Sequence, residues 1–281
     1  YLLLSSAVNV ALDLLFIAGL GWGVWSAAVA TTISQAISMA LCLIHLSGRR
    51  AMFRLQWSKL RIDRELFGEI VRYGLPSGVQ NCVISLANVI VQANINTFGK
   101  LAIAACGTYS KLEGFAFLPI TSFTMALTTY TGQNLGAREY KRAKKGARFG
   151  ILCALIIAEL IGLALYILMP QLAGLFSQTP EVIRMATRQA RTIAPFFFLL
   201  AYSHAVASVC RGAGKSIVPM LIMLGVWCAL RITYITLIMR LSHELRLLYL
   251  AYPITWSVSS IIYFIYYHFS DWIHGFEKSK A

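Results

Sequence analysis

Charged residues are scarce in this sequence of 281 residues, and acidic residues are the scarcest. Asp and Glu number 11 against 25 Lys and Arg, and charged residues make up only 13% of the chain, whereas apolar residues make up 58%. Soluble globular domains carry about 25% charged residues, so this composition excludes an ordinary soluble protein. The mean hydropathy of +0.67 indicates a protein embedded in a lipid bilayer.

Three other patterns are missing. No alternation of polar and apolar side chains recurs over segments of about ten residues, as a transmembrane β-barrel requires. The six cysteines lack CxxC spacing and fall within or at the end of apolar stretches, which argues against disulfides and metal sites. No constellation of residues typical of an enzyme active site is visible. We therefore expect no enzymatic activity and no cofactor.

Long apolar stretches are what the sequence has instead. Each covers about 20 residues, enough for a helix to cross a hydrocarbon layer of about 30 Å. The chain is therefore predicted to be an all-α, polytopic membrane helical bundle with about eight transmembrane helices. The expected spans are residues 1–20, 24–46, 73–97, 101–130, 146–169, 192–210, 217–239 and 247–269.

The Lys and Arg residues gather in alternate connections between these spans. Sixteen of the 25 lie in the second, fourth and sixth connections and in the C-terminal tail. By the positive-inside rule this side faces the cytoplasm, so we expect a multi-pass plasma-membrane protein with both ends of this chain cytoplasmic. The net charge of +14 then reflects membrane topology and not binding of nucleic acid.

Weak internal similarity relates the first two spans to the last two. The segment ALDLLFI aligns with ALRITYI, which places Asp13 opposite Arg231. With six more residues in the intervening connection, Thr31 aligns with Thr255. Parallel repeats are common in secondary transporters, although the few identities here are also compatible with chance.

A repeat of six helices divides the chain into four regions. The sequence begins without Met and already inside an apolar segment, so we expect about four further helices before it. The basic connection between the lobes is interleaved with apolar residues and fits either an interfacial segment or a solvated loop. The predicted regions are the last two helices of an N-terminal lobe (1–46), the cytoplasmic linker (47–66), a six-helix C-terminal lobe (67–270) and a cytoplasmic tail (271–281).

Polar residues recur along one face of the third span. Their spacing of three or four residues places them on one side of a helix, over about 22 Å. Lipid cannot satisfy such a stripe, so it lines a cavity or contacts another helix. For the whole stripe we favour a cavity, whereas each amide alone equally fits a hydrogen bond between helices. The stripe consists of Asn81, Ser85, Asn88, Gln92 and Asn96.

Ionisable residues within the later spans are functional candidates, because charges inside a membrane are costly. Lys111 and Glu113 are two residues apart in the fourth span, so we expect them to pair with other helices and not with each other. His204 is a weaker candidate, since a lone histidine is often a packing residue, and Arg231 is interpreted as a structural counter-ion. The predicted substrate cavity comprises Asn81, Ser85, Asn88, Gln92, Lys111, Glu113 and His204.

Asn9 and Asp13 lie one helical turn apart in the first span. A carboxylate at the centre of a bilayer costs about 2.5 to 3.5 kcal/mol, so this one needs a use or a partner. Two oxygen-bearing side chains on one helix face are suited to hold a proton or a hard monovalent cation. The alternative is that Asp13 only accepts hydrogen bonds from a neighbouring helix.

Several segments together resemble the multidrug and toxic compound extrusion (MATE) transporters, and among them the DinF-like bacterial branch. They follow one another through almost the whole chain, and their order is more specific than any one of them. Other branches carry an acid in the span corresponding to 73–97, which has no Asp or Glu here. The segments are NVALDLLF, GVWSAAVATTISQ, YGLPSGVQN, INTFG, GQNLGA and CRGAGKSIVP.

The resemblance implies two six-helix lobes and secondary active efflux, in which cationic amphipathic drugs are exchanged for H+ or Na+ by alternating access. It also implies that Asn9, Asp13 and Thr31 form half of a cation or proton site, with Na+ at Asp13 as one occupant. We expect a monomer with small substrates in a lipid bilayer.

Two other functions stay open at this point. One is a flippase for lipid-linked saccharides in a related two-lobe fold, which calls for a wide cavity with several exposed cations. The third span supplies few cations, so we place this function second. The other is a truncated fragment that does not transport, because a chain lacking four helices cannot close a symmetric pathway.

Overall fold

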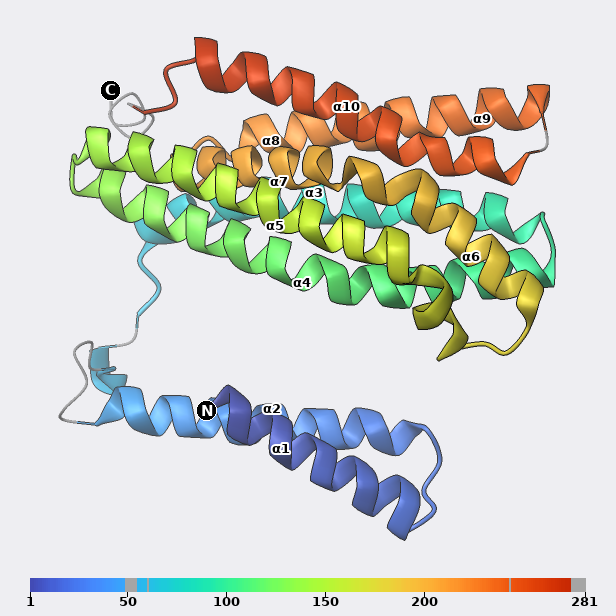
Figure 1. The fold of residues 1–281 in the computed structure, drawn as a ribbon. Coiled ribbons are helices and arrows are strands. Elements are labelled where there is room, and N and C mark those ends of the chain that lie inside the picture. The colour runs from blue at the N-terminus through green and yellow to red at the C-terminus, as the bar shows by residue number, and fades with distance from the viewer. Residues whose placement is uncertain (49–54, 60, 243, 274–281) are drawn as a thin grey trace. The chain divides into compact units, whose positions relative to one another are not determined.

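The computed structural model describes residues 1–48, 55–59, 61–242 and 244–273. Within these residues every regular element is helical (Figure 1). Seven helical segments are long and apolar enough to cross a membrane, which confirms the predicted all-α membrane fold. The chain divides into two compact units, Tyr1–Arg64 and Glu65–Ala281.

The first unit is a pair of helices. Helix α1 (Leu2–Asp13) continues into a π-helical segment (Leu14–Gly19), and a short connection leads to α2 (Trp25–Ser47). Small residues recur at every fourth position on the buried face of α2, which lets the two backbones approach closely. The Ser5 hydroxyl donates to the Ser34 carbonyl at 2.8 Å. The buried small residues of α2 are Ser26, Ala30, Ser34 and Ser38.

The second unit contains the remaining long helices, and it begins where α3 leaves the linker. A 3-10 turn at Ala194–Phe196 separates α6 from α7, and a π-helical segment at Met223–Leu230 joins α8 to α9. The helices are α3 (Arg64–Asn96), α4 (Lys100–Gly136), α5 (Tyr140–Gly174), α6 (Pro180–Ile193), α7 (Phe197–Gly212), α8 (Ile217–Ile222), α9 (Arg231–Leu241) and α10 (Leu245–Phe269).

Each predicted span falls on a helix, although helices such as α3 and α5 run past the expected bounds. Two larger differences concern the sixth and the fourth span. The sixth span was expected to begin at Thr192, but the helical segment begins at Pro180 with α6. The prediction missed α6 because its arginines lower the hydropathy of that segment. The fourth falls on α4, which is 37 residues long but is not among the seven apolar segments. Its charged pair, Lys111 and Glu113, and its many threonines account for this difference.

Three prolines in the later spans differ in their effect on the helix. The helix gives way to a 3-10 turn at Pro195, as expected for a residue that has no backbone N–H to donate. Pro119 and Pro253 instead lie inside α4 and α10, which continue past them. Of the linker, a 3-10 turn at Trp57–Lys59 is described. Its apolar residues Met52 and Phe53, like tail residues 274–281, lie outside the described residues.

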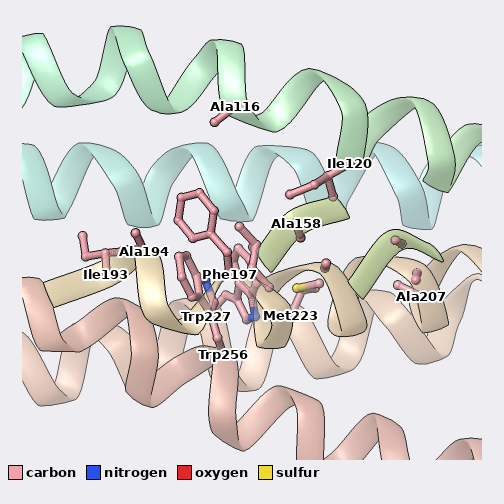
Figure 2. Packing of buried hydrophobic residues seen from close by; sticks show 14 of the residues in the cluster. Ala116, Ile120, Ala158, Ile193, Ala194, Phe197, Ala207, Met223, Trp227 and Trp256 are labelled. Carbon is pink, nitrogen blue, oxygen red and sulfur yellow. The ribbon is translucent and has the colours of Figure 1, made fainter. Parts of the chain in front are cut away.

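The core of the second unit is formed by α4, α5, α6, α7 and α10, and the π-helical segment packs against α10. Phe197 and Trp256 meet edge to face with ring centroids 6.1 Å apart, and Trp227 lies beside Trp256 (Figure 2). Small residues allow the close approaches: a Cβ atom on Gly212 would lie 2.5 Å from the Thr128 carbonyl oxygen of α4. Large side chains therefore fill the centre, while glycine and alanine bring the helices together around it.

The face of α5 that points away from the core is apolar and exposed, as a lipid-facing surface should be. Large apolar side chains follow one another there at steps of three or four residues, the period of one helix face. An exposed apolar stripe of this length is costly in water and favourable in hydrocarbon. Its members are Phe149, Leu152, Ile156, Leu160, Leu163 and Ile167.

Candidate functional site

A cavity of about 350 Å³ lies within the second unit. It is bordered by α3, α4, α7, α10 and the turn from the π-helical segment into α9. Its polar lining includes Asn81 and Asn88 from α3, Glu113 from α4 and His204 from α7. Four of the seven residues predicted for a substrate cavity therefore come together here.

Arg231 is the cation of this cavity, and it is only 1% exposed. Its Nη2 donates to Thr255 Oγ1 at 2.9 Å, and its Nη1 lies 3.4 Å from Asn88 Oδ1. The guanidinium carbon is 4.7 Å from the ring centroid of Tyr252 and 5.1 Å from that of Trp227. Two aromatic faces and two oxygens thus hold the charge, although Nε has no hydrogen-bond partner among the described residues.

Glu113 supplies the opposite charge. Tyr109, one turn earlier on α4, donates to Glu113 Oε1 at 3.0 Å. This partner lies on the same helix, whereas the sequence led us to expect one on another helix. Glu113 and Arg231 both line the cavity, so a carboxylate and a guanidinium share one small space with several aromatic rings, where their fields are screened less than in water.

His204 packs between aromatic rings. Its ring centroid is 5.2 Å from that of Phe117 and 5.4 Å from that of Trp227, both in edge-to-face geometry. Its Nε2 is buried and has no hydrogen-bond partner among the described residues. A ring nitrogen in this position is available to a guest in the cavity, and the packing role anticipated for this histidine accounts for the rest of its contacts.

The other three predicted cavity residues lie outside it. Ser85 is exposed on α3, and Gln92 donates to Asn96 Oδ1 at 3.0 Å along the same helix. Lys111 is exposed, with Nζ 5.5 Å from the ring centroid of Phe176. The whole stripe on α3 is exposed in this unit, and only Asn81 and Asn88 border the cavity.

The aromatic lining was missed by sequence reasoning. Phe117, Trp227, Tyr252 and Trp256 all border the cavity, but each looks like an ordinary core residue in an apolar span. One signal was available: Trp227 precedes Arg231 by four residues, so the two share a helix face.

The first unit holds the three residues predicted for a cation or proton site. Asn9 Nδ2 lies 3.4 Å from Thr31 Oγ1, which itself donates to the Ala27 carbonyl at 2.9 Å. Asp13 follows one turn later on α1 and is half-buried, and its Oδ1 has no hydrogen-bond partner among the described residues. The structure therefore joins Asn9 to Thr31 and leaves one carboxylate oxygen of Asp13, a helical turn after Asn9, without a hydrogen bond among the described residues.

These three side chains offer amide, hydroxyl and carboxylate oxygens. Hard cations prefer such oxygen ligands, and a buried carboxylate oxygen without a donor favours either a proton or a cation over an empty state. The residues present therefore fit a small monovalent cation or a proton.

Comparison with known proteins finds a family model and several relatives that match this chain. A family model described as MatE matches residues 76–235, more than half of the chain. The chain is 26% identical to the probable multidrug resistance protein YoeA of Bacillus subtilis, with 95% of this chain and 60% of that protein covered. It is 27% identical to the probable multidrug resistance protein NorM of Thermotoga maritima, with 80% and 50% covered.

The fold is shared with solved transporters. A MOP superfamily transporter from Pyrococcus furiosus superposes with a TM-score of 0.87 at 22% identity, over 94% of this chain and 60% of that one. An outward-facing MATE family transporter of the same superfamily gives a TM-score of 0.85. The chain thus spans between half and about 60% of the length of these relatives.

Proposed function

Since this chain belongs to the MatE family, we propose that it acts in secondary active efflux, exchanging small cationic, amphipathic drugs for protons or sodium ions. The names of its relatives, which describe multidrug resistance proteins, support a substrate of this class. Its helices support a place in the plasma membrane as a multi-pass protein. We propose the monomer as the working form, with both ends of this chain cytoplasmic.

The observation that carries the proposal is the lining of the 350 Å³ cavity. Glu113 provides a negative charge, and the rings of Phe117 and Trp256 provide flat apolar surfaces within the same space. A cationic aromatic drug needs both, because ring faces attract cations and pockets for small molecules are mostly apolar with a few polar groups. The volume lies near the lower end of the range of about 300 to 1,000 Å³ for such pockets.

Asp13 is the proposed coupling residue. An ion or proton held between Asn9, Asp13 and Thr31 would bind one conformation better than the other and shift their populations. One elementary charge that crosses a potential of 100 mV releases about 2.3 kcal/mol, enough to bias such an equilibrium by more than tenfold.

Ethidium efflux tests the proposal. Cells that express the protein should extrude ethidium, and Asp13→Asn should abolish extrusion while the variant still folds and inserts. Glu139→Gln is the matched control, because Glu139 is an exposed carboxylate in the turn between α4 and α5, and extrusion should be unchanged. Full extrusion by Asp13→Asn would remove Asp13 from coupling, and no extrusion by the unaltered protein would overturn efflux itself.

The coupling ion is identified in proteoliposomes. Proton and sodium gradients are imposed separately on the purified protein, and ethidium uptake or release is followed by fluorescence. Transport should follow one of the two gradients and should be absent without either.

A further inference from the structure

A second cavity, of about 1230 Å³, lies in the second unit. It is formed by α6, the beginning of α10 and the ends of the neighbouring helices. In Figure 1 this region lies at the end opposite the turn between α4 and α5. The basic loops that indicate the cytoplasmic side are therefore at one end of this unit, and the cavity is at the other.

Four arginines line this cavity: Arg184, Arg188 and Arg191 from α6, and Arg246 from α10. Along a helix the first three fall within an arc of about 60° at 100° per residue. They lie opposite the face on which α6 buries Val182, Ala186, Ala190 and Ile193. The amphipathic helix thus packs its apolar side into the core and presents a row of guanidinium groups to the cavity.

This concentration of positive charge runs against the topological pattern of the chain. Of the 25 basic residues, nine lie outside the connections and tail assigned to the cytoplasmic side, and four of these nine line the cavity. The lining contains one carboxylate, Glu244. Like charges three or four residues apart on a helix repel one another, so the row on α6 is stabilised when an anion lies between its members.

The rest of the wall is largely apolar. Phe98, Ile183, Met185 and Leu245 contribute to it, together with Tyr249, whose hydroxyl is 3.6 Å from Cys106 Sγ. A free inorganic ion makes no use of such a surface. A ligand with an anionic group and an apolar or aromatic remainder uses both parts, and the volume exceeds the range of about 300 to 1,000 Å³ typical of small-molecule pockets.

We propose that this cavity binds the phosphate or diphosphate group of an amphiphilic ligand, with Arg188 at the centre of the contact. Guanidinium groups pair with phosphate oxygens through two parallel hydrogen bonds, which makes arginine the preferred residue for this recognition. A flippase for lipid-linked saccharides calls for a wide cavity with several exposed cations. In this chain such cations are on α6 and not in the third span. The site does not depend on drug efflux or on Asp13.

Binding of inorganic pyrophosphate by the purified protein in phosphatidylcholine nanodiscs tests the site. Calorimetry should detect binding that weakens with salt, and Arg188→Gln should weaken it by about tenfold or more, since a hydrogen bond to a charged group is worth about 1.5 to 3 kcal/mol. Arg188→Lys keeps the charge without the paired geometry and should fall between. The control is Arg240→Gln, which removes an exposed arginine of α9 outside this lining.

A second arm separates the two sources of the phosphate group. In nanodiscs that contain phosphatidylglycerol, loss of pyrophosphate binding identifies a lipid headgroup as the competing ligand, and unchanged binding indicates a soluble phosphate compound. Arg184→Gln replaces Arg188→Gln if the latter fails to fold, as judged by thermal unfolding. The proposal is overturned if pyrophosphate does not bind in phosphatidylcholine, or if Arg240→Gln weakens binding as much as the cavity variants do.

Discussion

Arg231 donates a hydrogen bond to Thr255 at 2.9 Å, and this pair occupies the positions that the internal repeat assigns to Asp13 and Thr31. In the first unit Nδ2 of Asn9 lies 3.4 Å from Oγ1 of Thr31, the threonine that aligns with Thr255. Each threonine thus accepts a donor from the preceding helix. At the aligned position the first unit has an acid, Asp13, and the second has an arginine, and the donor to the threonine is Asn9 in the first unit and Arg231 itself in the second.

Loss of Arg231 should destabilise the second unit. Arg231→Gln removes a buried group that contacts Thr255 and Asn88, and we expect a loss of about 2 to 4 kcal/mol in the free energy of unfolding. Thermal unfolding in detergent measures the change. Arg240→Gln on the same helix is the control and should be nearly neutral, because Arg240 is exposed. Equal stability of the two variants would contradict the assigned contacts.

Thr31→Val should weaken ion coupling without abolishing it. The substitution keeps the shape of the side chain and removes the hydroxyl that faces Asn9. The ion concentration for half-maximal ethidium efflux should rise about two- to tenfold, since a neutral hydrogen bond is worth about 0.5 to 1.5 kcal/mol. Thr32→Val is the neighbouring control, because among the described residues Thr32 donates to the Ala28 carbonyl of its own helix. A similar rise for both variants would remove Thr31 from the site.

Glu113→Gln should raise the KM for a cationic drug by about tenfold, because the neutral amide no longer attracts the positive charge. A zwitterionic substrate should be affected less. Lys111→Gln, two residues earlier but outside the cavity, should leave the KM unchanged. Efflux kinetics in proteoliposomes measure both. An effect of Lys111→Gln as large as that of Glu113→Gln would favour the larger substrate cavity predicted from the sequence, which included Lys111, over the cavity described here.

Gly212→Ala should loosen the contact between α4 and α7. The added Cβ would lie 2.5 Å from the Thr128 carbonyl oxygen and 2.8 Å from Thr131 Cβ, so the helices must separate, at a cost of roughly 1 to 3 kcal/mol. Gly107→Ala is the control, since nothing lies within 4 Å of its added Cβ, and it should be neutral or slightly stabilising. Thermal unfolding distinguishes the two, and a neutral Gly212→Ala would show that the helices yield easily.

The candidate sites were only partly visible in the sequence. Helical periodicity correctly grouped Asn81 with Asn88, and the spacing of Asn9 and Asp13 on one face is a property of the helix alone. Periodicity says nothing of which distant helix packs against a face. Periodicity therefore extended the cavity to Gln92, and the cost of a charge inside a membrane added Lys111. Neither argument gave a reason to join Arg231 to Trp227, Tyr252 and Glu113.

The amino-acid sequence by itself determined that the chain lies in a membrane as helices. Its apolar stretches of about 20 residues place the backbone in lipid, where only helices or closed barrels satisfy the backbone hydrogen bonds, and the alternation that a barrel requires is missing. Tertiary structure decided which side chains meet. It buried Arg231 between two rings. It also made α6, whose arginines lower its hydropathy below that of a transmembrane span, into the wall of a cavity lined by arginines. Those outcomes depend on contacts between residues far apart in the chain, which local composition and period do not encode.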